Sequence, residues 1–189
     1  MAVIDTQSQV FIMESEKSMS QDSSIESNNF HKLSDTWILW AHLPHDTDWS
    51  IKSYIKICSF TTVEETISII NILPPKLVTN CMLFLMRDGI APTWEDARNR
   101  KGGCFSYKIS NKDVPQAWKE LTYVLVGESM SDNKNFIPLI NGITISPKKN
   151  FCIIKIWLDT CKLQDPGMII NISDLPREGC LFKNHAPEF

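Results

Sequence analysis

The chain has 189 residues, of which 43% are hydrophobic and 22% are charged, and its net charge is −3. This length fits one globular domain with a short tail, and it can bury a full core without disulfides or metals. No run of about 18 apolar residues is present, so we expect no membrane span. The first 30 residues lack the basic start and apolar stretch of a secretory signal, so we expect none.

Charge is distributed unevenly along the chain. Residues 1–30 contain five acidic residues, one lysine and seven serines, whereas the remainder holds 18 basic and 17 acidic residues. Such a segment buries too little apolar surface to offset its ordering entropy. We therefore predict a disordered, acidic, serine-rich tail over 1–30 and a folded domain over 31–189. A docking motif at the apolar patch 10–13 is the alternative for part of this tail.

The cysteine pattern indicates neither a metal site nor a disulfide framework. No two cysteines are spaced as CxxC, and no histidine pair has metal-ligand spacing, so we expect no metal and no cofactor. Without a secretion signal we interpret the thiols as reduced, which favours a cytoplasmic or nuclear protein. The six cysteines are Cys58, Cys81, Cys104, Cys152, Cys161 and Cys180.

The apolar pattern alternates strands and helices along the domain. A capping box at Thr62 opens a helix that ends at Pro74, and Asp113 starts a second helix that ends at Gly127. A weaker third helix is predicted within 163–172. Strands outnumber helices and several are joined by short turns, which predicts an α+β fold with an antiparallel sheet and helices on one face. The predicted strands cover 36–43, 54–60, 82–86, 104–109, 136–145, 151–158 and 180–182.

Signatures of common enzymes are missing. The sequence has no GxxxxGK[ST], GxGxxG or GxSxG motif. A Cys–His nucleophile stays open as an alternative, because its partners meet in space rather than in sequence. We expect a binding protein rather than an enzyme.

The six tryptophans divide into two groups. Trp37, Trp40 and Trp118 lie in apolar periodic segments, and we predict that they belong to the core. Trp49 and Trp94 lie in polar loops, where an indole is a good platform for stacking a flat ring.

Next to Trp94, the carboxylate of Glu95 can accept two hydrogen bonds from the N1–H and N2–H edge of guanine. A cationic base would gain a cation–π attraction as well. Lys148 and Lys149, at a predicted hairpin tip, either meet phosphates or form a solvated turn.

Together these residues resemble the eukaryotic translation initiation factor 4E family, which binds the cap of messenger RNA. The most distinctive block is Asp88-Gly-Ile-Ala-Pro-Thr-Trp-Glu-Asp96, which ends in a Trp-Glu-Asp motif. The order and spacing of eight short blocks carry the resemblance. They cover residues 31–40, 49, 60–64, 88–96, 99–103, 118–120, 127–129 and 156–157.

The resemblance implies a curved antiparallel sheet of about eight strands with three helices on its convex face. It implies that 7-methylguanine is sandwiched between Trp49 and Trp94, with Glu95 reading the base edge and Trp157 against the N7-methyl group. Lys148 and Lys149 would bind the cap phosphates. By this resemblance, Cys104 and Ser146 stand where the family has basic residues, so we expect the phosphate contacts to be lost or to be supplied differently, by Lys148 and Lys149.

The resemblance also implies a second surface on the helices, which binds a helical motif of a 4G-like scaffold or of an inhibitory binding protein and so recruits capped mRNA for translation. Ile67 replaces a family tryptophan there, and Lys119 a leucine, so the partner is expected to differ. A repressor-type paralogue and an interaction protein of the same fold that lost cap affinity are the alternatives. We expect a monomer. The predicted partner surface comprises His31, Leu33, Val63, Ile67, Trp118, Glu120 and Gly127.

Overall fold

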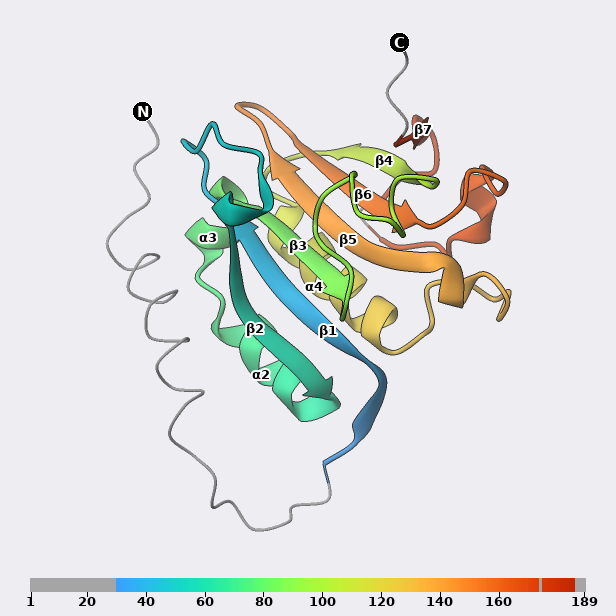
Figure 1. The fold of residues 1–189 in the computed structure, drawn as a ribbon, viewed down its shortest axis with the longest axis horizontal. Coiled ribbons are helices and arrows are strands. Elements are labelled where there is room, and N and C mark those ends of the chain that lie inside the picture. Colours follow the sequence, from blue (N-terminus) through green and yellow to red (C-terminus); the bar gives the residue numbers. More distant parts are fainter. Residues whose placement is uncertain (1–29, 174, 186–189) are drawn as a thin grey trace.

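Seven antiparallel strands form one curved sheet, in the order β2-β1-β3-β5-β6-β4-β7 (Figure 1). The computed structural model describes residues 30–173 and 175–185, so the predicted tail lies outside the described residues except for Phe30. The α+β antiparallel prediction is confirmed, with seven strands in place of about eight. The strands are β1 (Lys32–His42), β2 (Tyr54–Thr62), β3 (Met82–Arg87), β4 (Gly103–Ile109), β5 (Ile140–Pro147), β6 (Cys152–Leu158) and β7 (Leu181–Asn184).

Three α-helices, α2 (Val63–Ile72), α3 (Pro75–Asn80) and α4 (Val114–Val126), lie behind the sheet in Figure 1. The third helix was predicted at the wrong place. Pro75 starts α3 directly after α2, because proline is well suited to the first helical turn. Residues 163–172 contain only a 3-10 turn, Pro166–Met168, where Pro166-Gly167 prevents a longer helix. No helix among the described residues is long and apolar enough to cross a bilayer.

The predicted helix boundaries are confirmed at α2. The Thr62 hydroxyl accepts a hydrogen bond from the Glu65 backbone N–H at 3.2 Å, and the Glu65 carboxylate accepts one from the Thr62 N–H at 3.0 Å. Helix α4 begins after Asp113, whose side chain makes no capping bond, and it ends at Gly127. The left-handed conformation at this end falls on Glu128, with φ of 52°, rather than on the glycine.

The sheet carries a different apolar cluster on each face. The main core lies between the sheet and the helices, and it includes Trp37 and Trp118, as predicted. Trp40 does not belong to it: this ring is only partly buried and packs on the opposite face. There it contacts a smaller cluster, which we call the ligand-face cluster, made of the buried residues Phe84, Met86, Ile90 and Trp157.

A buried arginine fixes the end of β3, where the loop over 88–102 begins. Arg87 is 7% exposed, and it donates hydrogen bonds to the carbonyls of Ile140 at 2.9 Å and Ile137 at 3.2 Å. It also pairs with the Asp35 carboxylate, and its guanidinium lies 4.7 Å from the ring centroid of Trp37. Burial lowers the pKa of Arg87, and these partners compensate for the desolvation of its charge.

Candidate ligand-binding face

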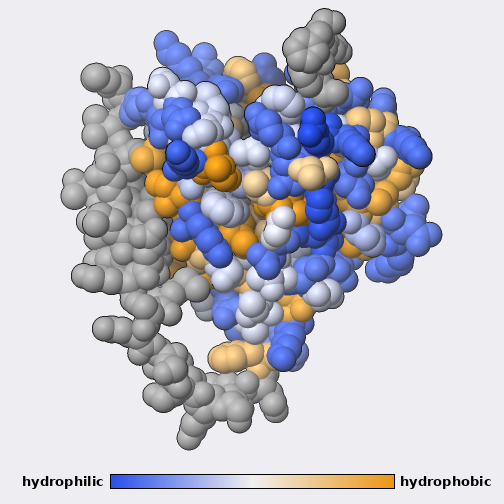
Figure 2. All heavy atoms as spheres, viewed as in Figure 1, coloured by the Kyte–Doolittle hydropathy of each residue, from blue (hydrophilic) through white to orange (hydrophobic). Residues whose placement is uncertain are grey.

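Two loops border the sheet face opposite the helices. One joins β1 to β2 over residues 43–53, and the other joins β3 to β4 over 88–102 and passes in front of the sheet (Figure 1). Each presents an indole to solvent, since Trp49 is 56% exposed and Trp94 is 44% exposed. In the same view, apolar surface shows through between hydrophilic side chains (Figure 2). Exposed rings of this size are candidates for binding rather than for folding.

Trp49 rests on a buried histidine. The imidazole of His42, at the end of β1, is parallel to the indole within 3°, with the ring centroids 4.3 Å apart. Its Nε2 lies 2.9 Å from the carbonyl oxygen of Asp48. The Asp48 carboxylate accepts from the N–H and hydroxyl of Ser50, both at 2.8 Å, and these bonds lower the pKa of Asp48. The loop is therefore held on both sides of Trp49.

A row of aromatic rings continues from His42 across the sheet. Neighbouring rings meet edge to face or tilted, geometries that aromatic pairs favour. The centroid distances are 5.0 Å for His42–Tyr54, 5.3 Å for Tyr54–Phe84, 6.5 Å for Phe84–Trp157 and 4.6 Å for Trp157–His185. This aromatic row provides a continuous floor for a flat ligand.

Glu95 reaches the same row from the 88–102 loop. Burial and, to a smaller extent, the negative charge of the Glu95 carboxylate raise the pKa of Tyr54 to about 12. Tyr54 contacts His42, and His42 stacks on Trp49, so the charge of Glu95 acts on the same row of rings that supports Trp49. Trp94 precedes Glu95 directly on this loop.

Buried asparagines hold the 88–102 loop in place. Asn99 is fully buried, and its Nδ2 donates to the carbonyls of Ala91 at 3.0 Å and Thr93 at 2.8 Å. Its Oδ1 accepts from Nδ2 of Asn141, on β5, at 2.9 Å. The Asp96 carboxylate accepts from the Ala91 N–H at 2.9 Å. The backbone that carries Trp94 and Glu95 is therefore preorganised.

Trp157 lies at the floor of the site and is 6% exposed. Its Nε1 donates to the hydroxyl of Thr144 at 2.8 Å. His185 covers another part of the ring, and it is fixed by a hydrogen bond from Nδ1 to the Asn99 carbonyl at 2.8 Å. Burial lowers the pKa of His185, which keeps this imidazole neutral.

The two lysines predicted to bind phosphate are exposed at the β5–β6 turn. This turn and the 43–53 loop lie at the same end of the sheet (Figure 1). Asn111 donates to the backbone carbonyls of Lys148 at 3.2 Å and Lys149 at 3.4 Å. These bonds hold the turn through its backbone and do not involve the lysine ammonium groups. Cys104 and Ser146 are buried and carry no charge. A further cation is Lys155, two residues before Trp157 on β6, whose charge contributes to lowering the pKa of His185.

On the helical side, most of the predicted partner surface is accessible. Val63 is 38% exposed and Ile67 is 44% exposed, while Leu33 and Glu120 are half-buried. Trp118 is the exception, since its indole is 1% exposed. It lies on the buried stripe of α4 and therefore packs beneath this surface instead of lining it.

Polar contacts tie the same surface together. Nδ1 of His31 lies 2.7 Å from the Glu64 carboxylate, and this hydrogen bond lowers the pKa of Glu64. The ammonium group of Lys119 donates to the Asn71 side chain at 2.8 Å, which joins α4 to α2. Gly127 is exposed at the end of α4.

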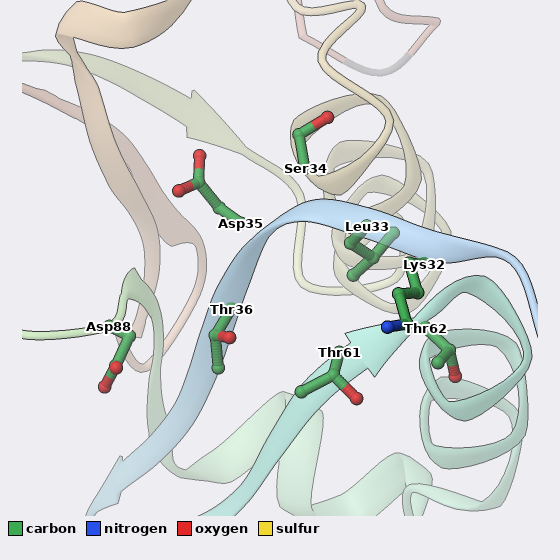
Figure 3. A pocket seen from close by; sticks show the side chains of 8 residues that line it. All are labelled: Lys32, Leu33, Ser34, Asp35, Thr36, Thr61, Thr62 and Asp88. Carbon is green, nitrogen blue, oxygen red and sulfur yellow. The ribbon is translucent and has the colours of Figure 1, made fainter.

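An open groove of about 640 Å³ lies at the opposite end of β1 from His42 (Figure 3). It forms where β1 separates from β2, because a register shift falls between Lys32 and Trp37. Its lining is mainly polar, and Leu33 is the one predicted site residue in it. The groove is lined by Lys32, Leu33, Ser34, Asp35, Thr36, Thr61, Thr62 and Asp88.

Sequence reasoning missed His42, Tyr54, Asn99 and Asn141 as parts of the site. His42 follows Trp40 at an alternate strand position and so shares its face, which is a usable signal. Asn141 interrupts an apolar strand, which also marks a special position. No group of three or more His, Cys, Asp or Glu side chains in the described part of the chain could hold a metal ion.

A curved antiparallel sheet is backed by helices on one face, and the two loops that border its other face carry exposed indoles. Residues 32–181 match the family model described as "Eukaryotic initiation factor 4E". The chain belongs to this family, which consists of cap-binding factors and not of enzymes.

Relatives and solved structures agree with this assignment. The chain is 30% identical over 151 residues to eukaryotic translation initiation factor 4E from Candida albicans, covering 74% of this chain and 70% of that protein. It superposes on Ascaris suum eIF4E-3 with an m2,2,7G cap at a TM-score of 0.61, with 25% identity, covering 70% of this chain and 76% of the other. It superposes on schistosome eIF4E with m7GpppG and 4E-BP at a TM-score of 0.64, with 25% identity, covering 71% of this chain and 75% of the other.

Proposed function

We propose that this protein binds the 7-methylguanosine cap of messenger RNA and recruits capped mRNA for translation initiation through a protein partner. One observation carries the proposal: an exposed indole, Trp49, is stacked on buried His42, whose neighbour Tyr54 lies within the electrostatic influence of the Glu95 carboxylate. Membership of the initiation factor 4E family and the cap ligands of its solved relatives support it.

In this proposal the methylated base stacks between Trp49 and Trp94. Methylation at N7 makes guanine cationic, so the indoles add a cation–π attraction that unmethylated guanine lacks. Glu95 accepts hydrogen bonds from N1–H and N2–H, and Trp157 lies against the methyl group. Two stacking contacts of about 1–3 kcal/mol each and charged hydrogen bonds of about 1.5–3 kcal/mol approach the ~8 kcal/mol of a micromolar complex.

In this proposal the cap phosphates are bound by lysines rather than by arginines. Lys148 and Lys149 are exposed at the same end of the sheet as the loop that bears Trp49. An ammonium group contacts phosphate as a point charge and without the bidentate geometry of arginine. Binding of the phosphates should therefore weaken strongly as salt concentration rises.

We propose that the partner is a helical peptide motif of a scaffold or of an inhibitory binding protein, which docks on the outer face of α2 and α4. The 4E-BP in the schistosome complex supports this class of partner. Val63 and Ile67 offer an apolar strip on α2, and Lys119 adds a cation that is bonded to Asn71. A partner that places an acidic side chain against Lys119 fits this surface better than a purely apolar one.

The same cation favours a second candidate function. Lys119 disfavours an apolar scaffold motif, so a repressor-type paralogue, which holds capped mRNA without recruiting it, accounts for this surface equally well. Addition of capped reporter mRNA and protein to a translation extract separates the two, because a promoter raises and a repressor lowers the translation of the capped message.

Titration calorimetry with 7-methyl-GTP and with GTP tests cap binding. We expect micromolar or tighter binding of the methylated ligand and binding of GTP that is weaker by tenfold or more. Glu95→Ala should weaken binding of 7-methyl-GTP by about 10- to 150-fold, because it removes both acceptors of charge-assisted hydrogen bonds. Glu178→Ala, at an exposed position in another loop, is the matched control and should bind as the original chain does. Equal affinities for the two ligands, or normal binding by Glu95→Ala, would contradict the proposal.

A further inference from the structure

We propose that His42 is a positioning residue for ligand stacking: its imidazole sets the plane of Trp49, and its protonation weakens the binding of a cationic base. The proposal rests on the proposed function, since the ligand is taken to be a methylated, positively charged purine. It adds a residue to the site and a pH dependence to the binding.

The position of His42 in the sheet explains why it can set the plane of a loop residue. It is the last residue of β1, where it pairs with Tyr54 of β2 and with Met82 of β3. Its side chain is 2% exposed, so the ring cannot turn freely. Trp49, by contrast, belongs to a loop and is 56% exposed. The rigid imidazole is therefore the reference surface, and the indole lies on it.

Two contacts from His42 fix adjacent residues of the loop. The imidazole stacks on Trp49 at 4.3 Å between centroids and within 3° of parallel. Its Nε2 lies 2.9 Å from the carbonyl oxygen of Asp48. A carbonyl oxygen only accepts hydrogen bonds, so Nε2 carries the hydrogen and donates it. A stack alone would let the indole slide, and the hydrogen bond to the preceding residue prevents that motion.

The charged and titratable groups around His42 come from three elements. The 43–53 loop contributes the Asp48 carboxylate, which is ionised at neutral pH. β2 contributes Tyr54, which meets the imidazole edge to face at 5.0 Å and stays neutral because burial raises its pKa to about 12. The charge of Glu95, from the 88–102 loop, acts on Tyr54, and β3 contributes the uncharged Met82. Of these groups, the imidazole is the one whose protonated form would place a positive charge directly against Trp49.

Protonation of His42 would place a positive charge on one face of Trp49 while the methylated base occupies the other. Both cations would draw on the same π electrons, and they would also repel each other. Through a site of intermediate dielectric, we expect this competition to weaken binding of the methylated base by about threefold to tenfold. An uncharged stacking partner would be affected less.

Two substitutions distinguish the effect of the flat ring from the effect of its protonation. His42→Phe keeps a flat ring but cannot be protonated, and His42→Leu removes the ring. Calorimetry with 7-methyl-GTP between pH 5.5 and 7.5 avoids a tryptophan signal that the substitutions themselves alter. We expect the original chain to lose threefold to tenfold more affinity on acidification than His42→Phe does. His42→Leu should bind about tenfold more weakly than His42→Phe at pH 7.5, because Trp49 is no longer held parallel. The ligand and all other residues are the same in the three proteins, so the difference between the profiles belongs to His42.

A ligand-free measurement distinguishes a failure of this inference from a failure of the proposed function. A protonated imidazole stacked on an indole quenches its fluorescence. Acidification should therefore quench the original chain by an amount that is absent from both His42→Phe and Trp49→Phe. If that quenching appears but 7-methyl-GTP does not bind, the proposed function falls and the positioning role stands. Parallel pH profiles for the original chain and His42→Phe, or no His42-dependent quenching, would overturn the inference.

Discussion

Removal of the Asn99 side chain should loosen the loop that carries Trp94 and Glu95. In Asn99→Ala, the carbonyls of Ala91 and Thr93 lose the Nδ2 donor that lies 3.0 and 2.8 Å away. Nδ2 of Asn141 loses its bond to Oδ1, although it keeps one to the carbonyl of Arg98 at 3.0 Å. The substitution therefore breaks three hydrogen bonds of a fully buried side chain.

The loss of stability depends on whether water can reach the polar groups that lose their hydrogen bonds to Asn99. An unsatisfied buried polar group costs about 1–3 kcal/mol. Ala91 and Thr93 are only partly buried, so water can reach their carbonyls, whereas Asn141 is fully buried. Taking the low end for the first two groups and the middle for the third, we expect the free energy of unfolding to fall by about 4 kcal/mol. The loop must also be ordered when ligand binds, so affinity for 7-methyl-GTP should fall by about tenfold or more.

Urea denaturation and calorimetry measure the two effects on the same preparation. Asn135→Ala, at an exposed position before η2 (Ile137–Leu139), is the matched control and should change neither quantity by more than about 0.5 kcal/mol. Unchanged ligand affinity in a folded but destabilised Asn99→Ala protein would refute the reasoning. It would mean that the loop reaches its binding geometry without these hydrogen bonds.

Three further outcomes are expected. Lys148→Ala combined with Lys149→Ala should reduce affinity for 7-methyl-GTP more than for 7-methylguanosine in calorimetry, and equal losses would argue against phosphate contact. Thr62→Ala should lower the free energy of unfolding in urea by about 1 kcal/mol, because it removes the capping bond to Glu65, while exposed Thr47→Ala should change it little. Alkaline pH should destabilise the fold, because burial raises the pKa of Cys58 to about 12 and those of Cys81 and Cys152 to about 11. The unfolded thiols ionise near pH 9 while the folded ones keep their protons, so stability that is complete below pH 9 is lost as pH rises toward 12, and a plateau across this range in urea titrations would contradict it.

Local patterns predicted the elements whose determinants lie close together in sequence. The capping box at Thr62 needs only residues 62 and 65, and the structure contains both of its hydrogen bonds. The polar surroundings of Trp49 and Trp94 predicted exposed loop indoles, and both are exposed. The stacking role of these rings and the role of Glu95 stay predictions, which the binding experiments address.

Features that depend on contacts between distant segments could not be predicted. Trp37 and Trp40 are three residues apart on β1, so they point to opposite faces, but the sequence does not say which face the helices cover. Asn99 meets Asn141 across 42 positions, and nothing near either residue indicates the partner. Helix α3 has six residues, which is too short for helical periodicity to appear.

The division of the sheet into two apolar clusters has a consequence for how the protein can diverge. The large cluster on the helical side supplies most of the buried apolar side chains, while the ligand-face cluster has four buried members. Substitutions on the ligand face therefore affect only a small part of the apolar burial that stabilises the fold. Cys104 and Ser146 lie on that face, and the sheet accommodates them within regular strand pairing. A scaffold built this way allows the recognised ligand to be retuned by single substitutions without a compensating change in the core.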